Sequence, residues 1–182
     1  MRPFRRRDAA AIHEAVIASL EELQQWLPWA SPDYSKIVSQ QFVRDSIGAW
    51  NSGRAYDFTV RRINNPQRHI GNVSVWHLSR QNSVGEIGYW VRSDEARQGI
   101  CTEAAAHILQ IGFEELGLHR ITLRTAAGNR ASERVAEKLG FLREGLLRNE
   151  VKIGNHWVDH AIWGLLVEEW KTKRESDRIH SP

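Results

Sequence analysis

The sequence has few features that would stabilise it covalently or hold it in a membrane. Its 182 residues include one cysteine, Cys101, which excludes an internal disulfide and leaves a thiolate zinc site short of ligands. No apolar run approaches the roughly 20 residues that a membrane-spanning helix needs, and no apolar signal-peptide segment follows Met1. These absences favour a reducing compartment, and we expect a cytoplasmic protein with no membrane partner.

A large excess of one charge is also missing. The net charge is only +3, and the basic stretches near the two ends are short and far apart in the sequence. We therefore expect solvated ends and no nucleic-acid partner. The eight histidines show no metal-ligand spacing, so no metal site is expected. The sequence does contain eight tryptophans, which is unusual. Tryptophans commonly line binding sites, although most of these eight should lie in the core.

The apolar pattern predicts a single α+β domain over residues 1–182. Its last part, residues 170–182, is polar and predicts either a frayed helix or a disordered tail. Asp8 is the expected N-cap of the first helix. The elements expected before the centre of the chain are an edge strand (2–4), two helices (8–23 and 35–51) and an antiparallel meander of three strands (55–61, 69–77 and 84–91).

The centre of the chain predicts a strand, a short loop at 96–101 and a helix over 102–116. Thr102 is the expected N-cap of that helix. Its N-terminus would present unpaired amides and the positive end of the helix dipole, which suits a pyrophosphate, although a plain helix start fits the pattern equally well. A strand at 121–125 then completes a βαβ crossover with parallel strands. The remaining expected elements are a helix (131–139) and a hairpin (142–153 and 156–166) that turns at Gly154-Asn155.

Four stretches of the sequence resemble one enzyme family. They are residues 26–29 (WLPW), 85–90 (GEIGYW), 97–104 (RQGICTEA) and 129–141 (NRASERVAEKLGF). In this order, and with Glu144, Gly145, Arg148, Gly154 and Asp159 downstream, they resemble the GNAT superfamily of acyl-CoA-dependent N-acetyltransferases. The likeness is greatest to the RimJ/RimL group, whose named members acetylate N-terminal amines of ribosomal proteins. The resemblance implies a mixed, largely antiparallel, twisted sheet with a central βαβ crossover and flanking helices.

The same resemblance implies acetyl-CoA as co-substrate and assigns its contacts. The pantetheine arm would pair with backbone groups of Val91 and Arg92, and Asn129 would hold the pantetheine region. Lys138 would either approach the adenosine phosphate or be a solvated helix charge. The pyrophosphate would lie on the loop residues Arg97, Gln98, Gly99, Ile100, Cys101 and Thr102. The loop departs from the family pattern at Ala96 and Cys101, and only Gly99 matches strictly.

Acetyl transfer needs a group that takes a proton from the amine and an acid for the departing thiolate. The resemblance assigns the acid role to Ser132, whose alternative is an ordinary hydroxyl in the first turn of a helix. Glu86 is the first candidate for the base and Glu150 the second, with a structural carboxylate or a water relay as alternatives. A covalent acetyl-enzyme on Cys101 is disfavoured, because the pyrophosphate loop lies far from the thioester. The candidate walls of the acceptor cleft are Trp26, Trp29, Trp76 and Trp90.

The expected function is therefore transfer of an acetyl group from acetyl-CoA to a primary amine. A protein N-terminal amine is favoured, because a polycationic acceptor would call for an acidic cluster near the tryptophans and the sequence shows none. The alternatives are a small-molecule amine (polyamine, antibiotic or toxin), an acyl-CoA-binding module that has lost catalysis, and a tryptophan-rich interaction domain. The sequence leaves the oligomeric state open, a homodimer included.

Overall fold

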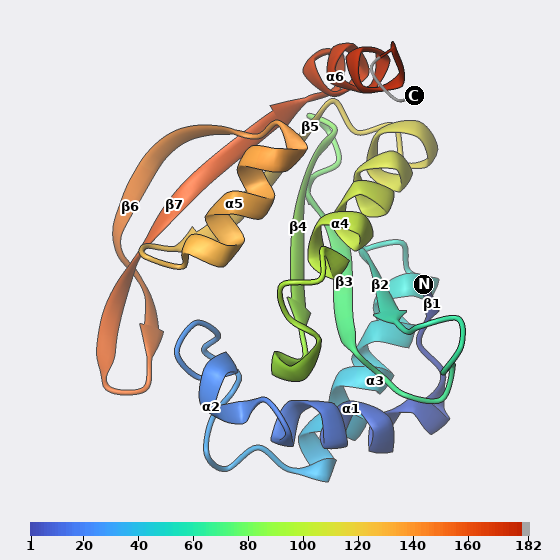
Figure 1. Cartoon of the computed structure of the whole chain (residues 1–182), viewed down its shortest axis with the longest axis vertical. Helices are drawn as coiled ribbons and strands as arrows, with labels where there is room; N and C mark the ends of the chain where they lie inside the picture. The colour runs from blue at the N-terminus through green and yellow to red at the C-terminus, as the bar shows by residue number, and fades with distance from the viewer. Residues whose placement is uncertain (180–182) are drawn as a thin grey trace.

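A seven-stranded mixed sheet runs through the molecule in the order β1-β2-β3-β4-β5-β7-β6 (Figure 1). The computed structural model describes residues 1–179. Neighbouring strands are antiparallel except β4 and β5, which are parallel, so the predicted meander and crossover are both confirmed. The strands are β1 (Arg2–Pro3), β2 (Ala55–Val60), β3 (Gly71–Ser79), β4 (Val84–Val91), β5 (Arg120–Ala126), β6 (Leu142–Ile153) and β7 (His156–Leu166).

Helices flank this sheet and lie at both of its ends. α1 and α2 lie toward one end (blue, bottom of Figure 1) and α6 toward the other (red, top), while α4 packs on β3 and β4. None of the helices among residues 1–179 is long and apolar enough to span a bilayer. The helices are η1 (Arg6–Asp8), α1 (Ala9–Ile17), α2 (Leu20–Leu23), α3 (Lys36–Asn51), η2 (Ser93–Glu95), α4 (Ile100–Gln110), the π-helix η3 (Ile111–Glu115), α5 (Arg130–Leu139) and α6 (Val167–Ile179).

The main core forms where one face of the sheet meets α4. Strand alternation sends Val73 and Ile87 to this face, and the helix period sends Ala105 and Ile108 to meet them; all four are almost completely buried. Burying a side chain of the size of Ile87 contributes about 1.5–3 kcal/mol. This packing fixes the start of α4 relative to the end of β4.

The predicted first helix is interrupted, and Asp8 is its N-cap residue but makes no capping hydrogen bond with its side chain. The chain leaves the helix after Ile17 and resumes it at Leu20 as α2. The Asp8 carboxylate bonds Arg2 at 2.7 Å, the Arg5 amide at 2.7 Å and Arg61 at 3.0 Å instead of a first-turn amide of α1. Burial alone would raise the pKa of Asp8, but these donors outweigh burial and hold the pKa below its usual range. Tertiary ion pairs thus take the place of the local cap.

The predicted boundaries of the central helix are also wrong. α4 begins at Ile100 with Gly99 as its N-cap, so Thr102 is the third residue of the helix and not its cap. The α-helix ends at Gln110 and continues as a π-turn rather than running unchanged to residue 116. In the left-handed conformation, at a φ of 79°, Gly99 redirects the chain earlier than a threonine cap would.

The predicted polar tail is helical as far as residue 179. Trp170 of α6 is buried, with its ring 5.2 Å from that of Phe113, so the disordered alternative is wrong for this part. The rest of that prediction, residues 180–182, lies outside the described residues. The hairpin turn at Gly154-Asn155 between β6 and β7 is confirmed.

Candidate active site

The parallel strands β4 and β5 separate halfway along their length. They pair from Val84 opposite Arg120 to Ile87 opposite Leu123; beyond that point β4 continues against β3 and β5 against β7 (Figure 1). Residues 88–91 and 124–126 therefore each lack a strand partner on the side of the split. An extended ligand can add to such a backbone edge as another strand does. Val91 lies on this edge as predicted, while the Arg92 amide already donates to the Ile70 carbonyl at 2.9 Å.

The loop before α4 has the geometry of an anion cradle. Arg97 and Gly99 both have positive φ angles, 61° and 79°. In the turn that starts α4, the Glu103 amide is the first to donate to a carbonyl, that of Gly99, at 2.9 Å. The amides of residues 99–102 therefore have no acceptor in the helix. A Cβ on Gly99 would meet no atom within 4 Å, so the space above the loop is open. These amides and the helix dipole fit a phosphate group.

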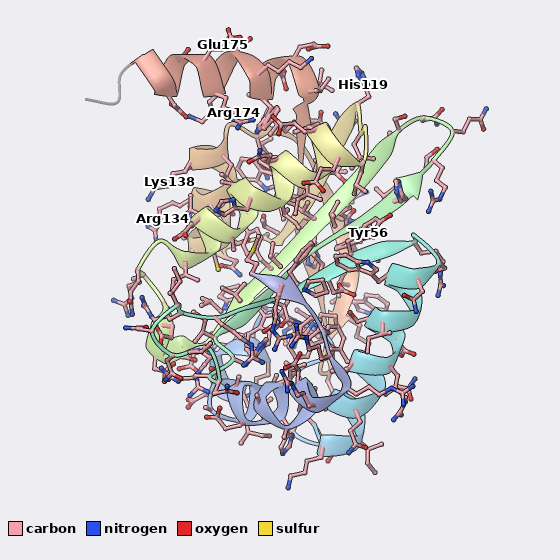
Figure 2. The ribbon with its side chains drawn as sticks, turned by 90° about the vertical axis from the view of Figure 1, so that its right-hand side faces the viewer. Tyr56, His119, Arg134, Lys138, Arg174 and Glu175 are labelled. Carbon is pink, nitrogen blue, oxygen red and sulfur yellow. The ribbon has the colours of Figure 1, made fainter. Side chains whose placement is uncertain are left out.

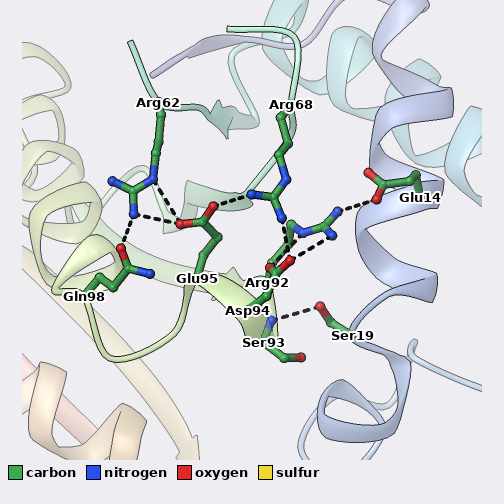
Figure 3. Close-up of polar contacts among 9 residues, drawn as sticks. All are labelled: Glu14, Ser19, Arg62, Arg68, Arg92, Ser93, Asp94, Glu95 and Gln98. Carbon is green, nitrogen blue, oxygen red and sulfur yellow. Dashed lines mark hydrogen bonds and ion pairs between the residues drawn. The ribbon is translucent and has the colours of Figure 1, made fainter. Parts of the chain in front are cut away.

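A buried carboxylate holds this loop against the rest of the protein. Glu95 is only 5% exposed; it accepts hydrogen bonds from Arg62 at 2.7 and 3.0 Å and from Arg68 at 2.6 Å (Figure 3). Arg62 also donates to the side-chain oxygen of Gln98. The segment between β2 and β3 is thereby tied to the predicted pyrophosphate loop.

The side chain of Arg92 belongs to the same network. It is buried and bonds Glu14 of α1 at 2.7 Å and Asp94 at 3.0 Å (Figure 3). The break between α1 and α2 contributes as well, because the buried Ser19 hydroxyl accepts from the Ser93 amide at 3.0 Å. The guanidinium of Arg92 is therefore occupied within the protein, and only its backbone is relevant to the predicted cofactor contact.

Glu95→Gln is expected to weaken acetyl-CoA binding and to lower the free energy of unfolding by about 1–3 kcal/mol, because two arginines lose their shared charge partner. Urea unfolding measures the stability and calorimetric titration measures the affinity. Asp94→Asn is the control, since Asp94 shares Arg68 with Glu95 but is more exposed and does not bind Arg62. Equal loss of affinity in both variants, or in neither, would remove Glu95 from a positioning role.

Ser132 contacts a half-buried tyrosine, Tyr89, that the sequence analysis did not single out. The hydroxyls of Ser132 and Tyr89 are 3.1 Å apart, and Tyr89 lies on the partly unpaired end of β4. Burial raises the pKa of the Tyr89 hydroxyl, which therefore remains a proton donor at neutral pH. Asn129 caps α5, its side-chain oxygen accepting from the Ser132 amide at 3.1 Å. The cap fixes Ser132 beside Tyr89.

The two candidate bases, Glu86 and Glu150, share one arginine. Nε and Nη2 of Arg124 donate to Oε2 of Glu86 at 3.0 and 2.9 Å, and the Thr122 hydroxyl reaches the same oxygen at 3.4 Å. Nη1 of Arg124 donates to Oε1 of Glu150 at 2.6 Å. The other oxygen of Glu150 is buried and has no hydrogen-bond partner among the described residues. The structure thus brings the two carboxylates together, and the hydrogen bonds of each end on one of its two oxygens.

A bulge in β6 aims Glu150 toward Arg124. Residues 148–150 lie opposite Asp159 alone, between the register pairs of Leu147 and Val151. Asn149 adopts a φ of 50°, and its amide donates to the Asp159 carboxylate at 2.8 Å. Bulges of this kind commonly redirect a side chain beside an active site.

Three of the four candidate tryptophans lie on one side of the sheet. Trp76 is in register with Glu86 and covers Gly88, while Trp90 shares their face by strand alternation. The rings of Trp90 and Trp29 are 6.0 Å apart. Trp26 is half-buried in the turn after α2. An aromatic surface therefore adjoins the carboxylates, as expected for an acceptor site.

The remaining candidates lie near the start of α4. Burial raises the pKa of the Cys101 thiol to about 12, so it is a poor nucleophile at neutral pH. Lys138 is exposed on α5 and lines a cavity of about 380 Å³ together with Thr102 and Arg174; Figure 2 shows Lys138 and Arg174 on the same side of the molecule. A larger cavity of about 750 Å³ lies on the other flank of α4, and no predicted catalytic residue lines it.

A split strand pair beside an anion-binding helix start suits an enzyme that binds an extended, phosphate-bearing co-substrate. The GNAT acetyltransferase domain family matches residues 1–142. The chain therefore belongs to the GNAT family and is an acetyl-CoA-dependent N-acetyltransferase, as the sequence resemblance implied.

Relatives of known name support this assignment. The chain is 28% identical over 175 residues to the putative ribosomal N-acetyltransferase YdaF of Bacillus subtilis, covering 92% of this chain and 91% of that protein. It is similar to the structure of Mycobacterium smegmatis RimJ in complex with CoA-disulfide, with a TM-score of 0.82 and 27% identity. The match covers 92% of this chain and 81% of the RimJ chain. The ribosomal-protein-S5-alanine acetyltransferase of Vibrio fischeri gives a TM-score of 0.84, 25% identity and 93% coverage of both chains.

Proposed function

We propose that this enzyme acetylates the N-terminal α-amine of a protein. The charge of the Arg124 cluster carries the proposal: two carboxylates share one guanidinium, which leaves one net negative charge beside the tryptophans. A single ammonium group balances that charge, whereas a polyamine or an aminoglycoside would bring several. YdaF is named as a putative ribosomal N-acetyltransferase and the Vibrio fischeri protein as a ribosomal-protein-S5-alanine acetyltransferase. Both names support the same acceptor class.

In the proposed reaction Glu150 accepts the proton of the attacking amine. The sequence ranks Glu86 first, but Arg124 and Thr122 donate three hydrogen bonds to Glu86, whereas Arg124 donates one to Glu150 and Oε2 of Glu150 accepts none among the described residues. A free carboxylate lone pair is what a general base needs. Arg124 holds both carboxylates in place and is a positioning residue.

The thiolate of CoA, in this proposal, receives its proton from Ser132. Tyr89 stands behind Ser132 at 3.1 Å and can return a proton to it, because burial keeps the tyrosine hydroxyl protonated. The loop amides of residues 99–102 and the free edge of β4 would hold the co-substrate so that its thioester lies at the split between β4 and β5. In this arrangement Ser132, which donates a proton, and Glu150, which accepts one, lie on opposite faces of the β4–β5 pair.

Ser132→Ala is expected to lower kcat by about 100-fold, with little change in the affinity for acetyl-CoA, because the departing thiolate loses its acid. Steady-state kinetics and calorimetric titration separate the two effects. Tyr89→Phe in the same assay should lower kcat less, and the double variant should lose no more than Ser132→Ala alone if the two hydroxyls act as one unit. Unchanged turnover in Ser132→Ala would remove it from the acid role.

Acceptor choice tests the proposal itself. The enzyme is incubated with acetyl-CoA and one acceptor at a time. The acceptors are peptides with a free N-terminal serine or alanine, the same peptides with a blocked N-terminus and an internal lysine, spermidine, and an aminoglycoside. We expect turnover with the free N-termini alone. Preferential turnover of spermidine or the aminoglycoside would make the enzyme a small-molecule acetyltransferase, and absence of turnover with every amine would point to a lapsed acyl-CoA-binding module.

A further inference from the structure

Two buried polar atoms, one of them on the proposed base, face each other without a hydrogen-bond partner. They are Oε2 of Glu150 on β6 and Nδ1 of His160 on β7, and the distance between them is 4.0 Å. Neither atom has a hydrogen-bond partner among the described residues. Buried polar atoms are normally paired, because an unpaired one loses its hydrogen bonds to water and gains none in the protein. The pair therefore needs an explanation beyond folding.

The surrounding structure holds this arrangement in place. Arg124 fixes the Oε1 side of Glu150 at 2.6 Å, which directs the other oxygen toward His160. The backbone of His160 is held on both sides, in register with Ala126 of β5 and Leu147 of β6. The bulge at residues 148–150 brings Glu150 to the imidazole ring. The separation lies just beyond hydrogen-bond length, so a small approach would join the two atoms once a proton lies between them.

We propose that His160 is the second proton acceptor of the reaction and receives from Glu150 the proton that leaves the amine. This step rests on the proposed function. The ammonium N–H bond breaks as an O–H bond forms on Oε2 of Glu150. That O–H bond then breaks as an N–H bond forms on Nδ1 of His160, which leaves a neutral amine, an ionised Glu150 and a cationic imidazole. About a tenth of the His160 side chain remains exposed, through which the proton can pass to water.

The charges around His160 suit a transient cation. Glu150 from β6 faces the ring, Arg124 from β5 contacts Glu150, and Glu86 from β4 is reached through Arg124. Asp159, the neighbour of His160 on β7, is bonded to the Asn149 amide. These groups sum to a net negative charge, so a proton on the imidazole is attracted and not repelled.

Kinetics with His160→Gln test the relay, using a peptide with a free N-terminal serine as acceptor. At pH 6.5, where an α-amine is mostly protonated, we expect kcat about tenfold below that of the unsubstituted protein, with KM for acetyl-CoA unchanged. At pH 9.5 the amine is already neutral in water, and the variant should recover most of the activity. His156→Gln, an exposed histidine on the same strand, should behave as the unsubstituted protein at both pH values. An equal loss at both pH values, or none at pH 6.5, would overturn the relay.

A second measurement needs no acceptor. In protein labelled with nitrogen-15 histidine, we expect NMR to show the Nε2–H tautomer of the His160 ring, with Nδ1 facing Glu150, and Glu150→Gln to change the Nδ1 signal. An unchanged Nδ1 signal would overturn the coupling between the two residues. Coupling without turnover of any amine would instead mean that the proposed function fails while the pair exists, so the two failures are distinguishable.

Discussion

Gly99→Glu is expected to abolish binding of acetyl-CoA. The Gly99 amide and the three that follow it face an open space at the N-terminus of α4, and a carboxylate there would fill that space and repel a pyrophosphate. In the unsubstituted protein, acetyl-CoA at about 100 times its dissociation constant should stabilise the fold by about 2.7 kcal/mol. In the variant this stabilisation should vanish. A thermal-shift titration measures it, with NADPH and ATP as control ligands.

A matched control separates the site from the strain of the substitution. Gly117 has a φ of 63° and, like Gly99, no atom within 4 Å of a built Cβ, but it follows the far end of the same helical segment, roughly 24 Å away by helix rise. Gly117→Glu should therefore destabilise the free protein and keep the full shift with acetyl-CoA. If Gly99→Glu also keeps the shift, the pyrophosphate binds elsewhere.

Glu150→Gln is expected to lower kcat by about 10²–10⁴-fold, with KM for acetyl-CoA unchanged. The amide keeps the shape of the side chain and an oxygen for Arg124, but it cannot take a proton from the amine. The loss should be greatest at low pH, where more of the acceptor is protonated. Initial rates across the pH range with a fixed peptide acceptor measure the effect.

Glu144→Gln is the control for this substitution. Glu144 lies on the same strand and pairs with Arg120, which, like Arg124, belongs to β5. It is 39% exposed in its side chain and precedes the bulge at residues 148–150 in β6, at a separate register shift, so turnover should be unchanged. If Glu86→Gln loses turnover while Glu150→Gln keeps it, Glu86 is the base. That outcome would support the order of candidates predicted from the sequence.

Much of the fold follows from local sequence. The runs 69–77 and 84–91 predict strands correctly, and the structure has them at Gly71–Ser79 and Val84–Val91. The Gly154-Asn155 turn was equally clear, since Gly154 adopts a φ of 57° that few residues tolerate. The crossover between β4 and β5 followed from the order of strand, helix and strand.

The errors arise where a side chain has competing partners. Asp8 and Thr102 are good caps by residue type, but Asp8 is engaged by two arginines from other segments and the helix start is set at Gly99. Sequence spacing gives no view of such competition. A charge inside an otherwise apolar strand was the available signal for Arg124, and Tyr89, Glu95 and His160 gave none beyond their residue type.

The sequence by itself determined the family and the co-substrate class and predicted the loop for its pyrophosphate, because these depend on residues contiguous in the chain. Only the tertiary structure decided that Glu150 accepts fewer hydrogen bonds than Glu86 and that its Oε2 faces His160. Glu86, Arg124, Glu150 and His160 come from four different strands. Their distances depend on the strand order, on the separation of β4 from β5 and on the bulge in β6. Proton transfer acts over a few ångströms, and contacts at that scale between distant segments are set by packing rather than by spacing in the sequence.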